Sequence, residues 1–232
     1  MTIVETRVAD GTVSLITMDD GKANALTKSG IAEMAAMIDA AAADEQVVAV
    51  VIAGRPGLFS GGFDLKVMNG GDFGAVVDLV ADGGDLVSHA YIAPIPVVAA
   101  CTGHAVAAGA FLLLGCDVRV GAEGDFKIGF NEVAIGMSLP DWGNTIAQER
   151  LSKRHLQRCV TNARLLDPST AVDAGFLDEL VDPDAVVDRA VELAAEFSSL
   201  DPGAYATTMT NFRGDTAAVM AQEATDMRSL AR

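Results

Sequence analysis

The sequence predicts an α/β fold. Two apolar runs, "VVAVVIA" at 47–53 and "PVVAACTG" at 96–103, do not alternate with polar residues, which is typical of strands covered on both faces. Each run leads into a stretch rich in glycine or other small residues, and segments with helical periodicity lie between and after them. Buried strands that alternate with helices favour a parallel sheet, and 232 residues suffice for a sizeable core.

Shorter patterns predict the N-terminal elements. Residues 3–8 and 12–18 alternate as strands do, and they flank Asp10-Gly11, a dipeptide favoured in hairpin turns. Thr27 is suited to cap a helix that ends in the acidic turn near 44–45. That helix has an apolar face formed by Ile31, Met34 and Ile38.

The second half of the chain is expected to be mainly helical. Residues 117–136 predict short strands and a turn, and the helices that follow are expected at 142–163, 168–175, 184–198 and 204–230. The acidic segment 178–201 contains a single cation, Arg189, and is interpreted as a solvated helix face. We therefore expect a core over 1–183 and a helical C-terminal region over 184–232.

Charge and cysteine usage narrow the class of partner. A formal net charge of −16 argues against nucleic acid or an anionic membrane as a partner, because both require a basic face. The three cysteines, Cys101, Cys116 and Cys159, form no C-x-x-C pair, so neither a disulfide framework nor a metal site is indicated. The N-terminus lacks the pattern of a secretory signal, and we expect a cytoplasmic protein.

Four stretches bear on function: "NAL" at 24–26, "FSGGFDL" at 59–65, "TGHAVAAGAF" at 102–111 and "IGFNEVAIGMSLPDW" at 128–142. Together and in this order they resemble the crotonase family, the enoyl-CoA hydratase and isomerase superfamily, over most of residues 3–182. The resemblance implies a crotonase-like spiral of ββα units, with a helical C-terminal region that helps to form a homotrimer or hexamer. It also implies an acyl-CoA thioester substrate and no cofactor besides the coenzyme A of that substrate.

The resemblance assigns an oxyanion hole to main-chain groups. A thioester enolate carries negative charge on its carbonyl oxygen, and two backbone N–H groups directed at that oxygen stabilise it. The implied donors are Phe63 in "SGGFD" and Ala108 in "AAG". In the family the second donor lies at the start of a helix, where the helix dipole adds to the hydrogen bond.

The same loops line the coenzyme A groove in the family. The implied substrate-binding residues here are Ala23, Ala25, Gly61, Gly62, Asp64 and Leu65, together with Phe111 and Asp141. Three lysines close to these motifs in the sequence are candidates for phosphate contacts: Lys22, Lys28 and Lys66.

The proton-transfer groups distinguish reactions within the family. Many hydratases use two glutamates, but the first position is Phe111 here, and only the second, Glu132, can ionise. One mobile base suffices to move a double bond from the 3 to the 2 position of an enoyl thioester. The stretch around Glu132 is similar to mitochondrial-type Δ3,Δ2-enoyl-CoA isomerases, so this reaction is favoured. Apolar neighbours such as Leu112 are expected to raise the pKa of Glu132 by desolvation.

Two alternatives remain open at the level of sequence. A hydratase would use Glu132 with Asp141, the residue after Pro140, although an aspartate there equally suits the start of a helix. The second alternative is an acyl-CoA-binding protein whose catalysis has decayed with the loss of the first glutamate.

Overall fold

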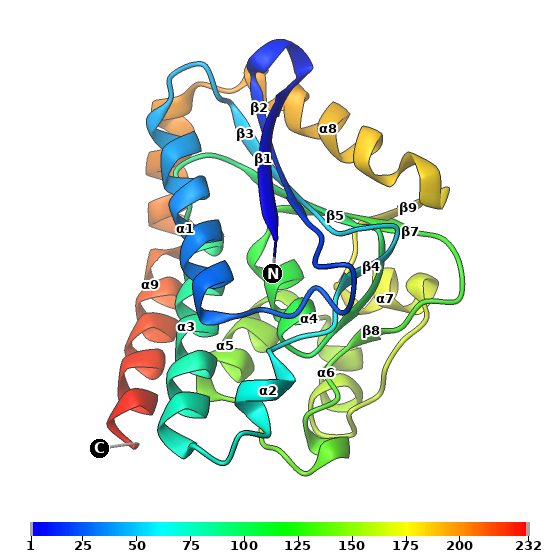
Figure 1. Ribbon diagram of the computed structural model, residues 1–232. Helices are drawn as coiled ribbons and strands as arrows, with labels where there is room; N and C mark the ends of the chain where they lie inside the picture. The colour runs from blue at the N-terminus through cyan, green and yellow to red at the C-terminus, as the bar shows by residue number, and fades with distance from the viewer. Residues whose placement is uncertain (1, 231–232) are drawn as a thin grey trace.

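The computed structural model describes residues 2–230, and within them the strands form two sheets (Figure 1). The larger sheet has the order β1-β2-β3-β5-β7-β9, with strands β1 (Ile3–Val8), β2 (Val13–Met18), β3 (Ala49–Ala53), β5 (Val97–Cys101), β7 (Val118–Ala122) and β9 (Glu179–Val181). The smaller has the order β4-β6-β8, with β4 (Gly57–Ser60), β6 (Gly103–Val106) and β8 (Ile128–Gly129). The expected α/β class is confirmed.

The N-terminal hairpin forms as the sequence predicts. β1 pairs with β2 in antiparallel register, from Ile3 opposite Met18 to Val8 opposite Val13. The turn between them contains Asp10 with a φ of 57°, a left-handed conformation that aspartate tolerates better than most residues. The other strand pairs of both sheets are parallel.

The two buried strands that the sequence predicts both pass from the larger sheet into the smaller one. β3 continues into β4, and β5 continues into β6, so that Gly57 and Gly103 become partners across β4 and β6. A Cβ atom added at Gly103 would lie 2.0 Å from the carbonyl carbon of Gly57. Only glycine fits at this crossing, and the crossing places the two glycine- and alanine-rich stretches side by side.

Helices surround the sheets. They are α1 (Lys28–Ala43), α2 (Leu65–Met68), α3 (Phe73–Tyr91), α4 (Ala108–Gly115), α5 (Asp141–Arg150), α6 (Lys153–Val160), α7 (Pro168–Ala174), α8 (Val186–Glu196) and α9 (Pro202–Ser229). In Figure 1, α1, α3 and α9 run beside one another along one side of the molecule, and α4 lies inside. Every residue of α4 is buried, which explains the wholly apolar sequence of that helix.

The helix expected at 142–163 is wrong in extent. The chain forms α5 and α6 instead, separated where Leu151 has an extended conformation with a ψ of 145°. The Ser152 N–H donates to the carbonyl oxygen of Ala174 (2.9 Å), so a tertiary contact with α7 replaces a helical hydrogen bond at the break.

The two C-terminal helices pack against different parts of the chain. Val186, Ala190 and Ala194 of α8 lie in a buried cluster with the strands of the larger sheet. On α9, the Arg213 guanidinium forms a buried ion pair with Asp117 (2.7 Å) that ties this helix to the turn after α4. The expected boundary near 183 falls between β9 and α8, and the division into a core and a C-terminal region stays a prediction. None of the described helices is both long and apolar enough to span a bilayer.

Candidate active site

A buried asparagine fixes the loop between β2 and α1 against β4. The Asn24 side-chain nitrogen donates hydrogen bonds to the carbonyl oxygens of Met18 (2.9 Å) and Phe59 (3.2 Å). The main-chain carbonyl of Asn24 accepts one from the Ser60 hydroxyl (2.8 Å). Asn24 has a φ of 46° and is fully buried, so its side chain serves the loop and not a ligand. The "NAL" motif is therefore held at the end of β4.

Main-chain hydrogen bonds extend this contact into the glycine-rich loop. The Gly61 N–H donates to Ala23 O (2.8 Å), and the Leu26 N–H donates to Gly62 O (2.8 Å). Leu26 also forms an isolated bridge with Phe63. The backbone before Phe63 is thus fixed by a buried neighbouring segment, which is the preorganisation that a main-chain donor needs.

The two amides implied as oxyanion donors come from adjoining segments. A Cβ atom added at Gly62 would lie 3.4 Å from the Ala108 nitrogen and 2.9 Å from the Ala107 Cβ atom. Gly62 has a φ of 101°, so glycine satisfies both the conformation and the close approach. Within residues 2–230, neither the Phe63 nor the Ala108 N–H donates to a backbone acceptor. Both amides are available to a ligand.

The residue before Ala108 has an unusual backbone conformation. Ala107 has φ 53° and ψ −125°, a region that L-residues with a Cβ atom rarely adopt. This turn starts α4 directly after β6 and places the Ala108 N–H at the helix N-terminus, where the helix dipole favours negative charge. Strained backbone at such a position is common in active sites.

A cavity of about 520 Å³ lies next to these amides. Its walls come from α2, α3, the start of α4, the segment 131–140 and the end of α9. It brings together five of the residues implied by the family resemblance, namely Gly61, Phe63, Leu65, Phe111 and Glu132. A cavity of this size suits a small organic ligand.

Glu132 is a buried carboxylate in this cavity. Only 7% of the residue is exposed, and within the described chain its Oε2 atom has no hydrogen-bond partner. Burial raises the pKa of the Glu132 carboxyl, while the backbone N–H groups of Glu132 and Asn131 act in the opposite direction. A carboxylate with an unpartnered oxygen and a raised pKa is suited to accept a proton from a bound ligand.

Phe111 forms part of an aromatic wall. Its ring stacks on Phe130 with centroids 4.1 Å apart and meets Trp142 edge-on at 5.0 Å. A Cβ atom added at Gly143 would lie 2.9 Å from the Phe111 ring, so α5 approaches closely. Phe111, at the position where the resemblance implies a glutamate in hydratases, is thus packed into an aromatic cluster.

The other residues implied for substrate binding have mixed placements. Ala23 is exposed, and the Ala25 N–H donates to a carboxylate oxygen of Asp20 at 3.3 Å. The Asp64 carboxylate accepts from the Lys66 N–H (2.9 Å) and caps α2. These contacts hold the loops in shape, and coenzyme A contacts at these positions stay a prediction.

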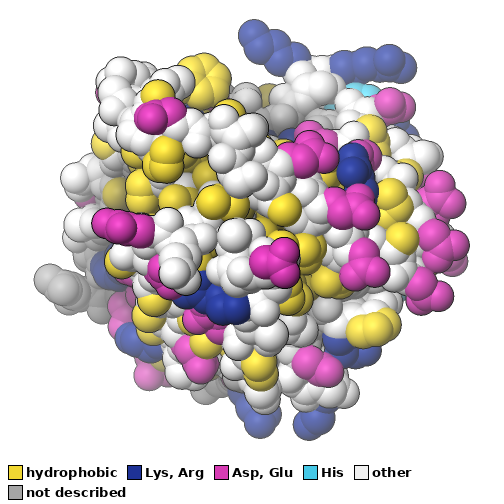
Figure 2. All heavy atoms as spheres, turned by 90° about the horizontal axis from the view of Figure 1, so that it is seen from above, with side chains coloured by type: hydrophobic (Ala, Val, Ile, Leu, Met, Phe, Trp, Pro, Cys, Tyr) yellow, Lys and Arg dark blue, Asp and Glu magenta, His cyan; other side chains and the backbone are white. Residues whose placement is uncertain are grey.

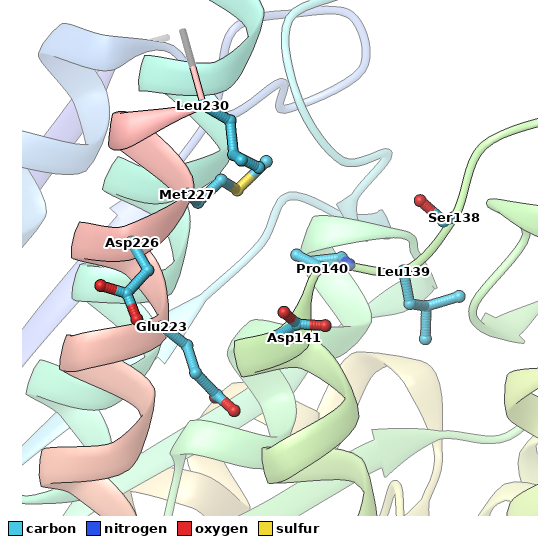
Figure 3. Close-up of a pocket in the computed structure, with 8 residues that line it drawn as sticks. All are labelled: Ser138, Leu139, Pro140, Asp141, Glu223, Asp226, Met227 and Leu230. Carbon is cyan, nitrogen blue, oxygen red and sulfur yellow. The ribbon is translucent and has the colours of Figure 1, made fainter. Parts of the chain in front are cut away.

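Asp141 lies at a second, neighbouring pocket of about 310 Å³ (Figure 3). It is the first residue of α5, and no side-chain hydrogen bond caps this helix. Glu223 and Asp226 of α9 line the same pocket. Glu132 and Asp141 therefore occupy different cavities, which share the Pro140 wall.

Some residues of the cavity have no counterpart in the sequence interpretation. Asn131, next to Glu132, lines it with an Oδ1 atom that is buried and unpartnered within the described residues. α3 contributes Phe73, Val76 and Val80, whose spacing in the sequence is that of one face of a helix and could have predicted this element. The region 66–95 received no element in the sequence interpretation. Over residues 2–230, no group of His, Cys, Asp or Glu side chains is arranged to hold a metal ion.

The chain matches a family model described as enoyl-CoA hydratase/isomerase over residues 9–230. The chain belongs to this family.

A structure of an enoyl-CoA isomerase from Mycobacterium tuberculosis is 39% identical to this chain and has a TM-score of 0.90, with 98% of this chain and 97% of that chain covered. A second structure of that protein, named there a probable enoyl-CoA hydratase, has a TM-score of 0.92 and covers 98% and 94%.

Curated relatives carry both names as well. A probable enoyl-CoA hydratase of Rhizobium meliloti is 32% identical over 85% of this chain and 75% of its own length. The mitochondrial enoyl-CoA delta isomerase 1 of Rattus norvegicus is 26% identical over 84% of this chain and 68% of its own length. The expected crotonase-like fold is confirmed, and the protein is an acyl-CoA enzyme of the enoyl-CoA hydratase/isomerase family.

Proposed function

We propose that this family member shifts the double bond of a 3-enoyl-CoA to the 2 position. One observation carries the proposal: among the described residues that line the 520 Å³ cavity, Glu132 is the only one with an ionisable side chain. Isomerisation needs one base that gives the proton back, whereas hydration also needs a group that positions and activates water. The isomerase name of the M. tuberculosis relative supports this choice.

The thioester carbonyl oxygen accepts hydrogen bonds from the Phe63 and Ala108 amides. Glu132 removes a proton from C2, and the electron pair moves into the carbonyl to form a dienolate whose oxygen the two amides stabilise. The protonated Glu132 then returns the proton to C4, and the double bond ends at the 2 position. No atom is gained or lost, so no co-reactant is required.

The aromatic wall around Phe111 favours this outcome over hydration. An apolar surface in the same cavity as the base holds water poorly, and desolvation raises the pKa of Glu132, which strengthens the carboxylate as a base. The lack of a second acid at Phe111 therefore favours isomerisation in two ways. It disfavours the addition of water, and it supports proton abstraction by Glu132.

A hydratase is the second candidate. Relatives named as hydratases support it, and so does the position of Asp141 just beyond the shared Pro140 wall. A rotation of that side chain toward the cavity would provide a second carboxylate. This candidate predicts that Asp141→Asn abolishes turnover of a 2-enoyl-CoA.

A side-by-side assay separates these functions. Purified protein is incubated with 3-enoyl-CoA and, separately, with 2-enoyl-CoA. The products are separated from the substrates by liquid chromatography, and their masses are measured by mass spectrometry. An isomerase converts the first substrate without a change in mass, whereas a hydratase converts the second into a product heavier by one water. Turnover of the 2-enoyl-CoA alone contradicts the proposal. Binding without turnover of either substrate indicates the decayed acyl-CoA-binding protein.

The proposed function also includes a binding site for coenzyme A and an oligomeric assembly. We infer that the loops at 23–25 and 61–65 hold the coenzyme A part of the substrate, and that the substrate's coenzyme A is the only cofactor. A trimer or hexamer would cover the outer face of α9, where Phe212 and Val219 are 75% and 48% exposed. Analytical ultracentrifugation measures the assembly directly.

A further inference from the structure

The 520 Å³ cavity, which would hold the acyl chain under the proposed function and which we name the acyl cavity, adjoins the second pocket. Among residues 2–230, four line both spaces, namely Ser138, Pro140, Met227 and Leu230. Two of them come from the segment before α5, and two come from the end of α9, with Met227 inside the helix and Leu230 directly after it. In Figure 3, Met227 and Leu230 project from α9 toward the segment that carries Ser138 and Pro140. These shared residues lie at the border between a space of about 520 Å³ and one of about 310 Å³.

The two spaces differ in chemistry. The acyl cavity is lined mainly by apolar side chains, whereas the second pocket contains the carboxylates of Asp141, Glu223 and Asp226. The Glu223 carboxylate accepts a hydrogen bond from the Thr145 hydroxyl (2.9 Å to Oε2), which fixes it on this side of the border. An acyl chain that crossed the border would therefore enter an acidic environment.

The helix that contributes Met227 to this border is anchored. Arg228 lies next to Met227 in the sequence, and its guanidinium forms ion pairs with Asp82 and Asp85 of α3, each at 2.6 Å. The last turn of α9 is thus held against α3. Of the two border residues at the end of α9, Leu230 is 76% exposed, whereas Met227 is partly buried and packs against the core. Met227 is the more enclosed part of the division.

We propose that Met227 sets the upper limit on acyl chain length by closing the acyl cavity off from the acidic second pocket. This inference rests on the proposed acyl-CoA function and names a specificity-determining residue for it. Methionine is long and unbranched, so it extends from α9 along the border of both spaces without a polar group. We expect its truncation to join the two spaces.

The carboxylates of the second pocket should make the joined space selective for neutral acyl chains. A longer neutral acyl chain gains buried apolar surface from the joined space. A chain of the same length that ends in a carboxylate meets Asp141, Glu223 and Asp226 and is repelled. In a variant that lacks the Met227 side chain, binding affinity should therefore increase with the length of a neutral acyl chain but not with the length of a chain that ends in a carboxylate.

Binding measurements test this without depending on the reaction. The affinities of saturated acyl-CoA thioesters from butanoyl- to tetradecanoyl-CoA are measured by calorimetry for the wild type and for Met227→Ala. We expect the variant to improve affinity for the longest chains relative to butanoyl-CoA by about tenfold or more, which is the effect of a methylene or two in an apolar pocket. Met227→Phe should shift the preference toward shorter chains. A dicarboxylic monothioester should gain nothing in Met227→Ala.

Met220→Ala is the matched control, because Met220 lies two turns earlier on α9, is fully buried and lines neither space. A general loosening of α9 would change chain preference in Met220→Ala as well, and that result overturns the proposal. An unchanged preference in both Met227 variants also overturns it. If the wild type binds no acyl-CoA at all, it is instead the proposed function that fails.

Discussion

At the scale of single residues, the buried carboxylate of Glu132 contributes to the pH dependence of both activity and stability. Burial raises its pKa above the ordinary value of 4.5. The folded state therefore holds a proton that the unfolded state has already released, and this contribution to stability is lost as pH rises through the raised pKa. The base is active only in the ionised form, so activity rises over the same interval.

We expect Glu132→Gln to lower the isomerisation rate by about 100-fold or more, because general-base catalysis is lost. The same variant should be more stable than the wild type at about pH 8, and the difference should shrink at about pH 4, since glutamine remains neutral at both. Thermal melts at the two pH values measure it.

The exposed Glu123 provides the control for Glu132. Glu123→Gln should leave the isomerisation rate unchanged. Full isomerase activity in Glu132→Gln would show that another group carries the proton.

Ala107 allows a second test at this scale. Its φ of 53° and ψ of −125° are costly for alanine and accessible to glycine. We expect Ala107→Gly to increase the free energy of unfolding by about 1 kcal/mol, measured by denaturant titration.

The matched substitution for Ala107 is Ala36→Gly, at an exposed position within α1. There the change should destabilise by about 1 kcal/mol, because glycine is a poor helix former. Equal destabilisation at both positions would mean that the turn before α4 is not strained.

At the scale of elements, α3 is a long helix that the sequence interpretation did not assign, and its glycines explain why. Gly83 and Gly84 weaken the helical signal, yet a Cβ atom at Gly84 would lie 2.7 Å from the Trp142 ring. One at Gly83 would lie 2.4 Å from the Phe63 ring. Glycine is required at these two positions by packing against residues distant in the sequence, which local helix propensity cannot reveal.

Gly83→Ala should therefore lower activity although it touches no substrate. The added methyl group displaces the Phe63 ring and with it the main-chain N–H that we assign to the oxyanion hole. A misplacement of about 1 Å costs up to about 100-fold in rate, which steady-state kinetics measures.

Gly74→Ala on the same helix is the comparison, because its Cβ atom would meet only the Asp72 carboxylate at 3.4 Å. This variant should keep its activity and gain stability. Normal activity in Gly83→Ala would show that the position of the Phe63 amide does not depend on the position of the Phe63 ring.

The candidate site was predictable where it depends on local motifs. Phe63, Phe111 and Glu132 follow from short stretches of sequence and do meet in one cavity. The position of Met227 at the border of both pockets was not predictable, since it depends on how α9 lies against the segment before α5. The break at Leu151 was missed for the same reason, because Ser152 bonds to a residue of α7.

At the scale of the whole molecule, the net charge of −16 opposes a polyanionic substrate. Carboxylates are spread over the face shown in Figure 2. Like charges slow encounter, and salt screens them over about 10 Å at 0.1 M ionic strength. We therefore expect the KM for an acyl-CoA to fall as ionic strength rises from about 0.01 to about 0.15 M.

A neutral thioester of N-acetylcysteamine serves as the control and should show no such trend. A rise in KM with salt would indicate that local cations near the loops, such as the exposed Lys22, Lys28 and Lys66, outweigh the overall charge.

The main-chain origin of the two proposed oxyanion donors has a consequence for how this scaffold can change over generations. No substitution of Phe63 or Ala108 removes its N–H, apart from proline, so the part that activates a thioester is sheltered from most single mutations. The proton-transferring part rests on one side chain, Glu132. New reactions on coenzyme A thioesters are therefore most accessible through changes at cavity side chains such as Phe111, with enolate stabilisation inherited intact.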